Sequence, residues 1–325
     1  MRIELADDPT AFHTADWTGA VMDDPNGTFF HTPAYLKLWW EEFGAGRLLI
    51  ATAAEQGSVA AACAFQLEEG LLTFLGGFDV TDYMGPVARP SLAEPFAKEL
   101  LTAVAAEVEW ERADLRGLPD RAPWIDLLES AAAAQGLRTE RSGDGVCPIL
   151  RLPATYEEYL AALPSKLRHE IRRKERRLYA DFAEVTVEFA TEETLPALYD
   201  RFIALHQLSE GPKGKFMHAG MEIFFRRLGE AFLPPHVFHL GFVRVDGAEA
   251  AGVIGFGFKD SFSLYNSVFD REYSKWSPGM FLIADTIRRA IDDGRKVYDL
   301  LKGDPEYKSR FGPTPMPVHR LVVQR

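Results

Sequence analysis

The stretch SVFDREYSKWSPGMFLIADTIRRAIDDGRKVYDLLKGDPEYKSRFG, residues 267–312, contains the local signals that decide the fold. The tripeptide SPG at 277–279 is typical of a helix start, because a serine can cap the first turn and a proline fits its first position. The apolar residues that follow recur at helical spacing, and KVYDLL then predicts a short buried strand. The turn GDP ends that strand, so Tyr307 and Lys308 stand just beyond it.

The same order of elements is predicted twice. A helix, three short strands, a second helix and a further strand fill residues 35–119, and the series returns in 221–301. Matching positions lie 185 to 190 residues apart, with Asp114 and Asp299 at 185. An internal duplication is the economical explanation, although an α/β chain can show this order without one. We expect an α/β (α+β) fold of two tandem domains, 1–152 and 153–325, each a mixed, largely antiparallel sheet flanked by helices.

Composition is that of a globular chain. Of 325 residues, 47% are hydrophobic and 26% charged, and no run of 18 residues is apolar throughout. The N-terminal residues include early acids and no apolar signal segment, so we expect a cytoplasmic protein without a membrane span. Cys63 and Cys147 lie far apart and outside any Cys/His cluster, so we expect neither a disulfide framework nor a metal site.

One segment reverses the charge of the chain. The net charge is −12, yet residues 165–178, SKLRHEIRRKERRL, contain seven basic and two acidic residues. Arg168, Arg172 and Arg176 recur every four residues, which places them on one ridge of a helix. The ridge is either a solvated face or a contact for a phosphate-bearing substrate, such as a nucleotide-linked precursor, a carrier-protein arm or a tRNA end.

Residues 267–312 resemble the core of the GNAT acyltransferase superfamily, in which a strand, a phosphate-binding turn, a helix, a strand and an LYxKxGF-like ending occur in this order. Together with TFFHTPAYLKLWWEEFG at 28–44, they look like the CelD-like subfamily, a relative of the Fem peptidoglycan aminoacyltransferases, whose members carry two GNAT-like domains. One departure matters. Enzymes of the superfamily that use coenzyme A usually have a (Q/R)xxGx(G/A) turn, whereas SKWSPG at 274–279 leaves fewer amides for a pyrophosphate.

The resemblance implies an acyltransferase that moves an acyl group from an activated donor to an amine acceptor by direct attack. Acyl-CoA is the expected co-substrate, and no permanently bound cofactor is expected. The second domain would hold the donor at the helix start and on the strand beside it. The residues concerned are Lys275, Ser277 and Gly279 at the helix start, and Tyr265, Asn266 and Ser267 on the strand. An ordinary helix cap and the two alternating faces of a strand are the structural alternatives.

Four further residues are candidates for catalysis by the same resemblance. Tyr307 would protonate a departing thiolate, and Lys308 would stabilise charge on the transferring ester or carbonyl. Asp299 would orient Lys308 or receive a proton from the amine, unless it caps the turn to Gly303. His206, which precedes a Gly- and Lys-rich loop long enough to act as a lid, is a candidate base or a structural histidine.

Two rival functions remain open. The missing glycine-rich turn, the basic segment and Lys308 suit an aminoacyl-tRNA-dependent transferase of Fem type, and a noncatalytic binding module with the same fold is the third class. Other chemistries are disfavoured, because the sequence has no GxSxG, HExxH or GxxxxGK(S/T) motif. His236 and His239 are three positions apart at the start of a predicted strand and make a poor metal pair.

Overall fold

The chain forms two units in the computed structural model, which describes residues 1–209, 212–303 and 305–325. Unit 1 contains Met1–Cys147 and Met316–Arg325, and unit 2 contains Pro148–Pro315. Compared with the boundary after Leu152 that the sequence suggests, the chain enters unit 2 slightly earlier, and its last residues belong to unit 1. The reason is that β13 (Thr314–Gln324) pairs antiparallel with β6 (Arg112–Pro119). No helix within the three described ranges is long and apolar enough to cross a membrane.

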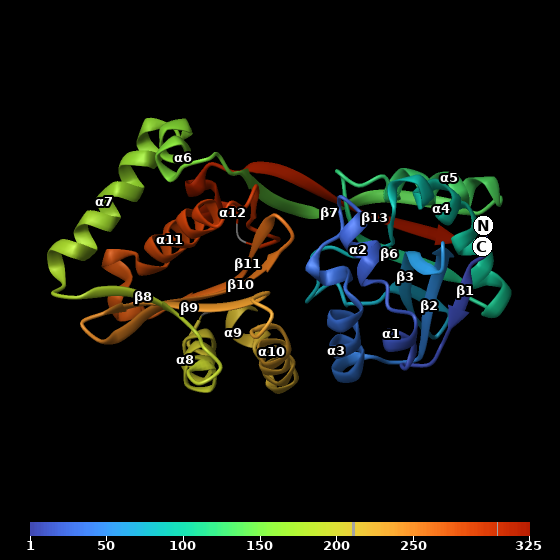
Figure 1. The fold of residues 1–325 in the computed structure, drawn as a ribbon, viewed down its shortest axis with the longest axis horizontal. Coiled ribbons are helices and arrows are strands. Elements are labelled where there is room, and N and C mark those ends of the chain that lie inside the picture. The colour runs from blue at the N-terminus through green and yellow to red at the C-terminus, as the bar shows by residue number, and fades with distance from the viewer. Residues whose placement is uncertain (210–211, 304) are drawn as a thin grey trace. The chain divides into compact units, whose positions relative to one another are not determined.

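Unit 1 is a twisted sheet with helices on both faces (Figure 1). Its strands follow the order β1-β2-β3-β4-β6-β13, and β5 pairs with β3. Aromatic and aliphatic side chains of α4 and α5 pack on the sheet and form most of its core. The elements are β1 Glu4–Ala6, α1 Ala11–Thr14, α2 Thr18–Asp23, η1 Phe29–His31, α3 Pro33–Phe43, β2 Arg47–Glu55, β3 Ser58–Glu68, β4 Leu71–Phe74, β5 Val87–Ala88, η2 Pro90–Leu92, α4 Ala93–Glu107, β6 Arg112–Pro119, α5 Trp124–Ala134 and β7 Arg138–Arg151.

Unit 2 has the same layered plan. Its strands follow the order β12-β11-β10-β9-β8, and the end of β7 pairs with β12. Helices α7 and α11 lie on one face of this sheet, and α8 to α10 lie on the other (Figure 1). The elements are α6 Tyr156–Ala162, α7 Ser165–Asp181, β8 Val185–Phe189, α8 Leu195–Gln207, α9 Pro212–Phe216, α10 Ala219–Phe232, β9 Phe238–Val245, β10 Ala248–Phe258, β11 Ser261–Phe269, η3 Arg271–Trp276, α11 Pro278–Asp292, β12 Val297–Asp299, α12 Pro305–Lys308 and η4 Ser309–Phe311.

The strand registers of the two units repeat, which confirms the predicted duplication. In unit 1 β4 pairs parallel with β6, so that Thr73 lies opposite Asp114. In unit 2 β11 pairs parallel with β12, so that Ser263 lies opposite Asp299. The two central hairpins also match at an offset of 190 residues, because Ile50 opposite Ala64 in β2–β3 corresponds to Leu240 opposite Ile254 in β9–β10.

An irregularity is repeated as well. The β2–β3 ladder shifts register after Ala53 opposite Ala61, which makes Ala60 the extra residue of a β-bulge. The β9–β10 ladder shifts between Glu249 and Ala251, which makes Ala250 the extra residue at the corresponding place. A shared bulge is harder to explain by a common element order than by a common ancestor, since each bulge bends its strand at one defined point.

Candidate active site

The start of α11 offers few backbone amides to a ligand. Ser277 precedes the helix with left-handed dihedrals, φ 58° and ψ 52°, and its amide donates to the carbonyl oxygen of Ser274. The amides of Met280 and Phe281 both donate to the carbonyl oxygen of Ser277. Pro278 has no N–H. Within the described ranges, the amide of Gly279 is therefore the one in this turn that no protein group accepts from.

Gly279 leaves that amide accessible. A Cβ built on this residue would meet nothing closer than the Cβ of Phe269 at 3.9 Å. A helix N-terminus attracts anions through its open amides and its dipole, so this turn suits one phosphate group better than a pyrophosphate. The side-chain cap predicted for Ser277 is not formed, because the left-handed backbone directs its hydroxyl to another partner.

That partner is Lys174, a residue that the sequence reasoning missed. Its Nζ lies 2.5 Å from Oγ of Ser277 and 3.8 Å from Glu170, and its side chain is 14% exposed. Burial lowers the pKa of Lys174, and Glu170 opposes that effect. A signal was present in the sequence, since Lys174 lies three positions after Ile171 and four before Leu178, on the buried side of the basic helix.

The predicted Lys275 has a different environment. Its side chain is exposed, and Nζ lies 3.8 Å from the centre of the Trp276 ring in a cation–π contact. The indole of Trp276 donates to Asp181 of α7 at 2.7 Å and so ties η3 to the end of the basic helix. Lys275 thus adds positive charge at the surface before α11, while Lys174 supplies the sheltered charge.

The predicted arginine ridge lies on α7 but is partly engaged within the protein. Arg168 donates to the carbonyl oxygen of Ala161, and Arg172 pairs with Glu157 at 2.9 Å, both on α6. Arg176 donates through Nε to the carbonyl oxygen of Arg172. These contacts leave other guanidinium N–H groups on each residue, so phosphate binding by the ridge stays a prediction.

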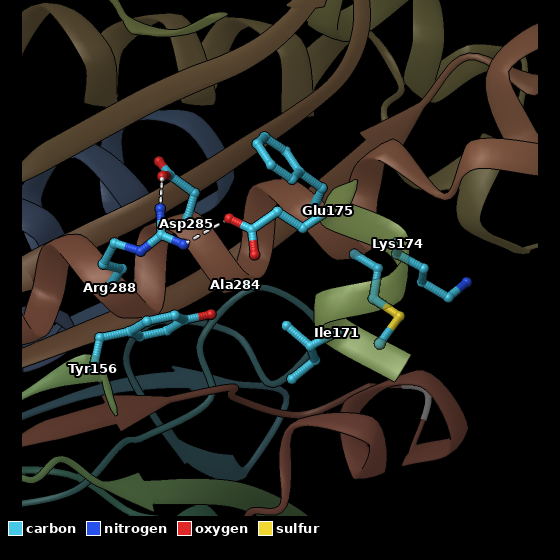
Figure 2. Close-up of a pocket in the computed structure, with 9 residues that line it drawn as sticks. Tyr156, Ile171, Lys174, Glu175, Ala284, Asp285 and Arg288 are labelled. Carbon is cyan, nitrogen blue, oxygen red and sulfur yellow. Dashed lines mark hydrogen bonds and ion pairs between the residues drawn. The ribbon is translucent and has the colours of Figure 1, made fainter. Parts of the chain in front are cut away.

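Helices α7 and α11 pack tightly below this region (Figure 2). Arg288 of α11 pairs with Glu175 of α7 at 3.0 Å and with Asp285 at 3.5 Å, and its guanidinium lies 4.6 Å from the centre of the Tyr156 ring. The cavity between them measures about 10 Å³, which holds about one water molecule. Burial raises the pKa of Tyr156 to about 12, so this phenol stays neutral at physiological pH. This pocket is a helix contact and has no room for a substrate.

The strand beside α11 has a bulge where the donor residues were predicted. The β10–β11 ladder passes from Ile254 opposite Asn266 to Gly255 opposite Leu264, so Tyr265 is the extra residue. A bulge re-aims the residues next to it. Tyr265 packs against Phe225 of α10, with ring centres 5.2 Å apart, and Asn266 contacts His206 of α8. The two successive side chains thus face the same helical layer.

His206 lies inside the protein. Its side chain is completely buried, and Nε2 is 3.1 Å from Nδ2 of Asn266. The rings of Phe202 and Phe216 lie at 6.2 and 5.9 Å. The Oδ1 of Asn266 accepts from the amide of Ser267, so the histidine, the asparagine and the strand backbone form one connected group. Glu210 and Gly211, which belong to the predicted lid, lie outside the described residues.

The end of β12 brings Asp299 and Lys308 into one turn. Asp299 is 3% exposed, and its Oδ1 accepts from the amide of Leu301 at 2.8 Å. Lys308 is also 3% exposed, and Nζ donates to the carbonyl oxygens of Leu301 and Lys302 at 2.8 and 2.6 Å. These bonds hold the backbone at Leu301, whose φ of +54° is unfavourable for a branched side chain. The capping alternative for Asp299 is the contact that the structure displays, and Lys308 is an interior lysine.

Tyr307 is half-buried on α12 and packs against the core of unit 2. Its neighbour is Tyr298 of β12. Burial raises the pKa of Tyr298 well above its ordinary value, the hydrogen bond with Thr286 opposes this, and Tyr307 adds to it. The phenol of Tyr307 therefore lies at the end of the strand that pairs with β11, as the sequence predicted, and its catalytic role stays a prediction.

Comparisons with known proteins agree with this architecture. Residues 165–309 match the family model described as "Acetyltransferase (GNAT) domain". FemX superposes with a TM-score of 0.67 at 10% identity over 97% of this chain and 96% of FemX. A conserved protein of unknown function from Bacteroides thetaiotaomicron gives 0.66 at 13% identity over both whole chains. A tandem GNAT protein from the clavulanic acid biosynthesis pathway gives 0.51 at 12% identity over 98% of each chain. No curated protein matches the sequence.

The structural likenesses are at low identity and therefore describe the fold: two GNAT-like units in one chain. The matched family region covers most of unit 2, from the basic helix to the turn after β12. Every element that carries a predicted site residue lies within it. The elements are α7, α8, β11, η3, α11, β12 and α12.

Proposed function

Because this chain is a tandem member of the GNAT superfamily with a Fem-like fold, we propose that it is an N-acyltransferase whose donor site lies in unit 2. The observation that carries the proposal is the association of the GNAT region with three features of that unit. These are the bulged strand β11, the accessible amide at the start of α11, and the lysine that approaches the same turn from α7. Together they can hold an activated acyl donor by its phosphate and its carbonyl.

The reaction is direct. The neutral amine attacks the acyl carbonyl carbon, a C–N bond forms, and the C–S bond of a thioester or the C–O bond of an ester breaks. The amine loses a proton, and the leaving sulfur or oxygen gains one. Tyr307 is the proposed proton source for the leaving atom, since a phenol with an ordinary pKa can donate and be recharged by solvent. Positioning of donor and acceptor supplies much of the remaining rate enhancement.

His206 and Asn266 are proposed as positioning residues. The buried imidazole fixes the amide side chain, and that side chain accepts from the amide of Ser267, so the three together hold the strand next to the bulge. Backbone amides on such a strand can stabilise the tetrahedral oxyanion if they are held rigidly. Lys308 is proposed to act in the same way on the turn after β12, through two carbonyl groups.

Two donors deserve comparison, and one observation separates them. Acyl-CoA is the donor that the superfamily resemblance favours. A coenzyme A pyrophosphate needs several amides, however, and the first turn of α11 provides one. An aminoacyl-tRNA presents single phosphodiesters, and the basic helix α7 also exposes Lys166 and Arg173. The single amide with Lys174 therefore favours the aminoacyl-tRNA donor, the second candidate function.

A transfer assay with paired variants tests both candidates. Purified protein is given acetyl-CoA, a longer acyl-CoA or a charged tRNA with a mixture of amine acceptors, and N-acylated products are measured by mass spectrometry. Lys174→Met removes the sheltered ammonium, whereas Lys296→Met removes an exposed lysine of the same unit and serves as control. We expect the KM for the productive donor to rise about tenfold or more in Lys174→Met only, the effect of one lost charge-assisted phosphate contact. Absence of product from every donor contradicts the proposal.

A further inference from the structure

Unit 1 contains a pocket far larger than the cavity between α7 and α11. Its volume is about 310 Å³, which is within the range of small-molecule sites. It is lined by residues of α3, β3, β4 and β6 and by the loop after β4. Thr73 and Asp114 are among them, and these are the counterparts of Ser263 and Asp299 in unit 2. The pocket thus occupies the place in unit 1 that the turn after β12 occupies in unit 2.

One wall of the pocket is aromatic and contains an unused donor. Trp39, Phe43 and Phe78 contribute rings, and Phe78 is 52% exposed at the opening. Trp39 is 7% exposed, and its Nε1 is buried without a hydrogen-bond partner among the described residues. Gly77, with φ +67°, brings its backbone against the edge of that indole. A buried indole N–H normally finds an acceptor, so this one points to a ligand that supplies an oxygen.

The charges at the opposite side leave one carboxylate over. Asp114 accepts two bonds from Arg320, at 2.6 and 2.7 Å, and a further contact from Arg116. These bonds outweigh the desolvation of the carboxyl and hold the pKa of Asp114 below its usual range, so it is ionised and fully paired. Glu68 also lines the pocket, is exposed, and has no ion pair within the part of the chain that the structure describes. The lining therefore carries one uncompensated negative charge.

We propose that this pocket binds a small amphipathic amine that carries an oxygen acceptor. Its apolar body packs on Trp39, Phe43 and Phe78, its oxygen accepts from Nε1 of Trp39, and its ammonium pairs with Glu68. The proposal concerns unit 1 alone and does not depend on acyl transfer in unit 2. Aromatic rings also favour a cation at their faces, so the aromatic wall and the carboxylate select the same sign of charge.

Indole NMR tests the site directly. The protein is labelled with ¹⁵N-tryptophan, and the signal of Trp39 is identified by its loss in Trp39→Phe. Three probes are titrated: L-phenylalaninamide, which has ring, carbonyl and ammonium; 3-phenylpropanamide, which lacks the ammonium; and phenethylamine, which lacks the carbonyl. We expect a saturable shift of the Trp39 signal with L-phenylalaninamide, and binding about tenfold weaker for each of the other two.

Charge reversal experiments complete the test. Glu68→Gln should weaken L-phenylalaninamide about tenfold and leave 3-phenylpropanamide unchanged, whereas Glu99→Gln, an exposed acid on α4, should change neither. Since Glu68 is on the surface, this variant folds even if Trp39→Phe does not. Absence of a saturable shift with all three probes overturns the site. Equal binding of the amine and of the neutral amide, or an equal affinity in Glu68→Gln, overturns the assignment of an amine.

Discussion

Lys308→Met should damage the fold of unit 2 more than the chemistry. Methionine keeps the apolar stem of the side chain but cannot donate to the carbonyl oxygens of Leu301 and Lys302, which Nζ contacts at 2.8 and 2.6 Å. An acceptor that loses its partner in the interior costs about 1–3 kcal/mol, and two are lost. Relief from burying an ammonium offsets part of this cost. We expect the free energy of unfolding to fall by about 2–4 kcal/mol.

The assay is thermal and urea unfolding of the purified variant beside Lys296→Met, which removes an exposed lysine from the same unit. In a unit of this size a loss of this magnitude lowers the midpoint by about 5–10 °C, and the control should stay within about 1 °C. Transfer by the remaining folded protein at low temperature should be reduced only modestly. A variant of Lys308 that is fully stable but inactive would refute the reasoning, because it would make this lysine the catalytic cation that the resemblance implied.

Three further predictions concern the site. The pKa of Lys174 is lowered by burial, so its ammonium loses its proton below the ordinary pKa of lysine; as pH rises through that lowered value the KM for a phosphate-bearing donor should rise, and Lys174→Arg should abolish this pH dependence. Tyr307→Phe should lower kcat for a thioester donor by about 10²- to 10⁴-fold in steady-state assays with donor binding nearly intact, whereas an unchanged kcat would make it a packing residue. Replacing Arg168, Arg172 and Arg176 by Gln should raise the KM and weaken its salt dependence for a tRNA donor; identical salt curves for both proteins would show a merely solvated ridge.

The repeat was readable from sequence because it rests on local patterns. The glycine turns, the alternating strands and the helix start at residues 277–279 each carry their own signal, and the registers of β4–β6 and β11–β12 follow the predicted offset. The paths of β7 and β13 were not predicted. Their partners are set by pairings between residues far apart in sequence, such as Leu150 with Tyr298 and Val322 with Asp114, for which no local pattern exists.

The site shows the same division. Residue types at the start of α11 and at the end of β12 predicted where chemistry could be located, but not how each side chain is used. Lys308 follows a motif, yet its partners are two carbonyl groups, and only the left-handed backbone at Leu301 brings them within reach. Lys174 was hidden in a run of seven basic residues, and its importance comes from packing of α7 on α11.

The most direct measurement of the central claim is native mass spectrometry of the purified chain with acetyl-CoA, a longer acyl-CoA, an acyl carrier protein and a charged tRNA, each with and without an amine mixture. Direct N-acyl transfer predicts a noncovalent complex with at least one donor, deacylation of that donor only when an amine is present, and no acyl group left on the protein. Failure of every donor to bind, or a stable covalent acyl-enzyme, would contradict the account.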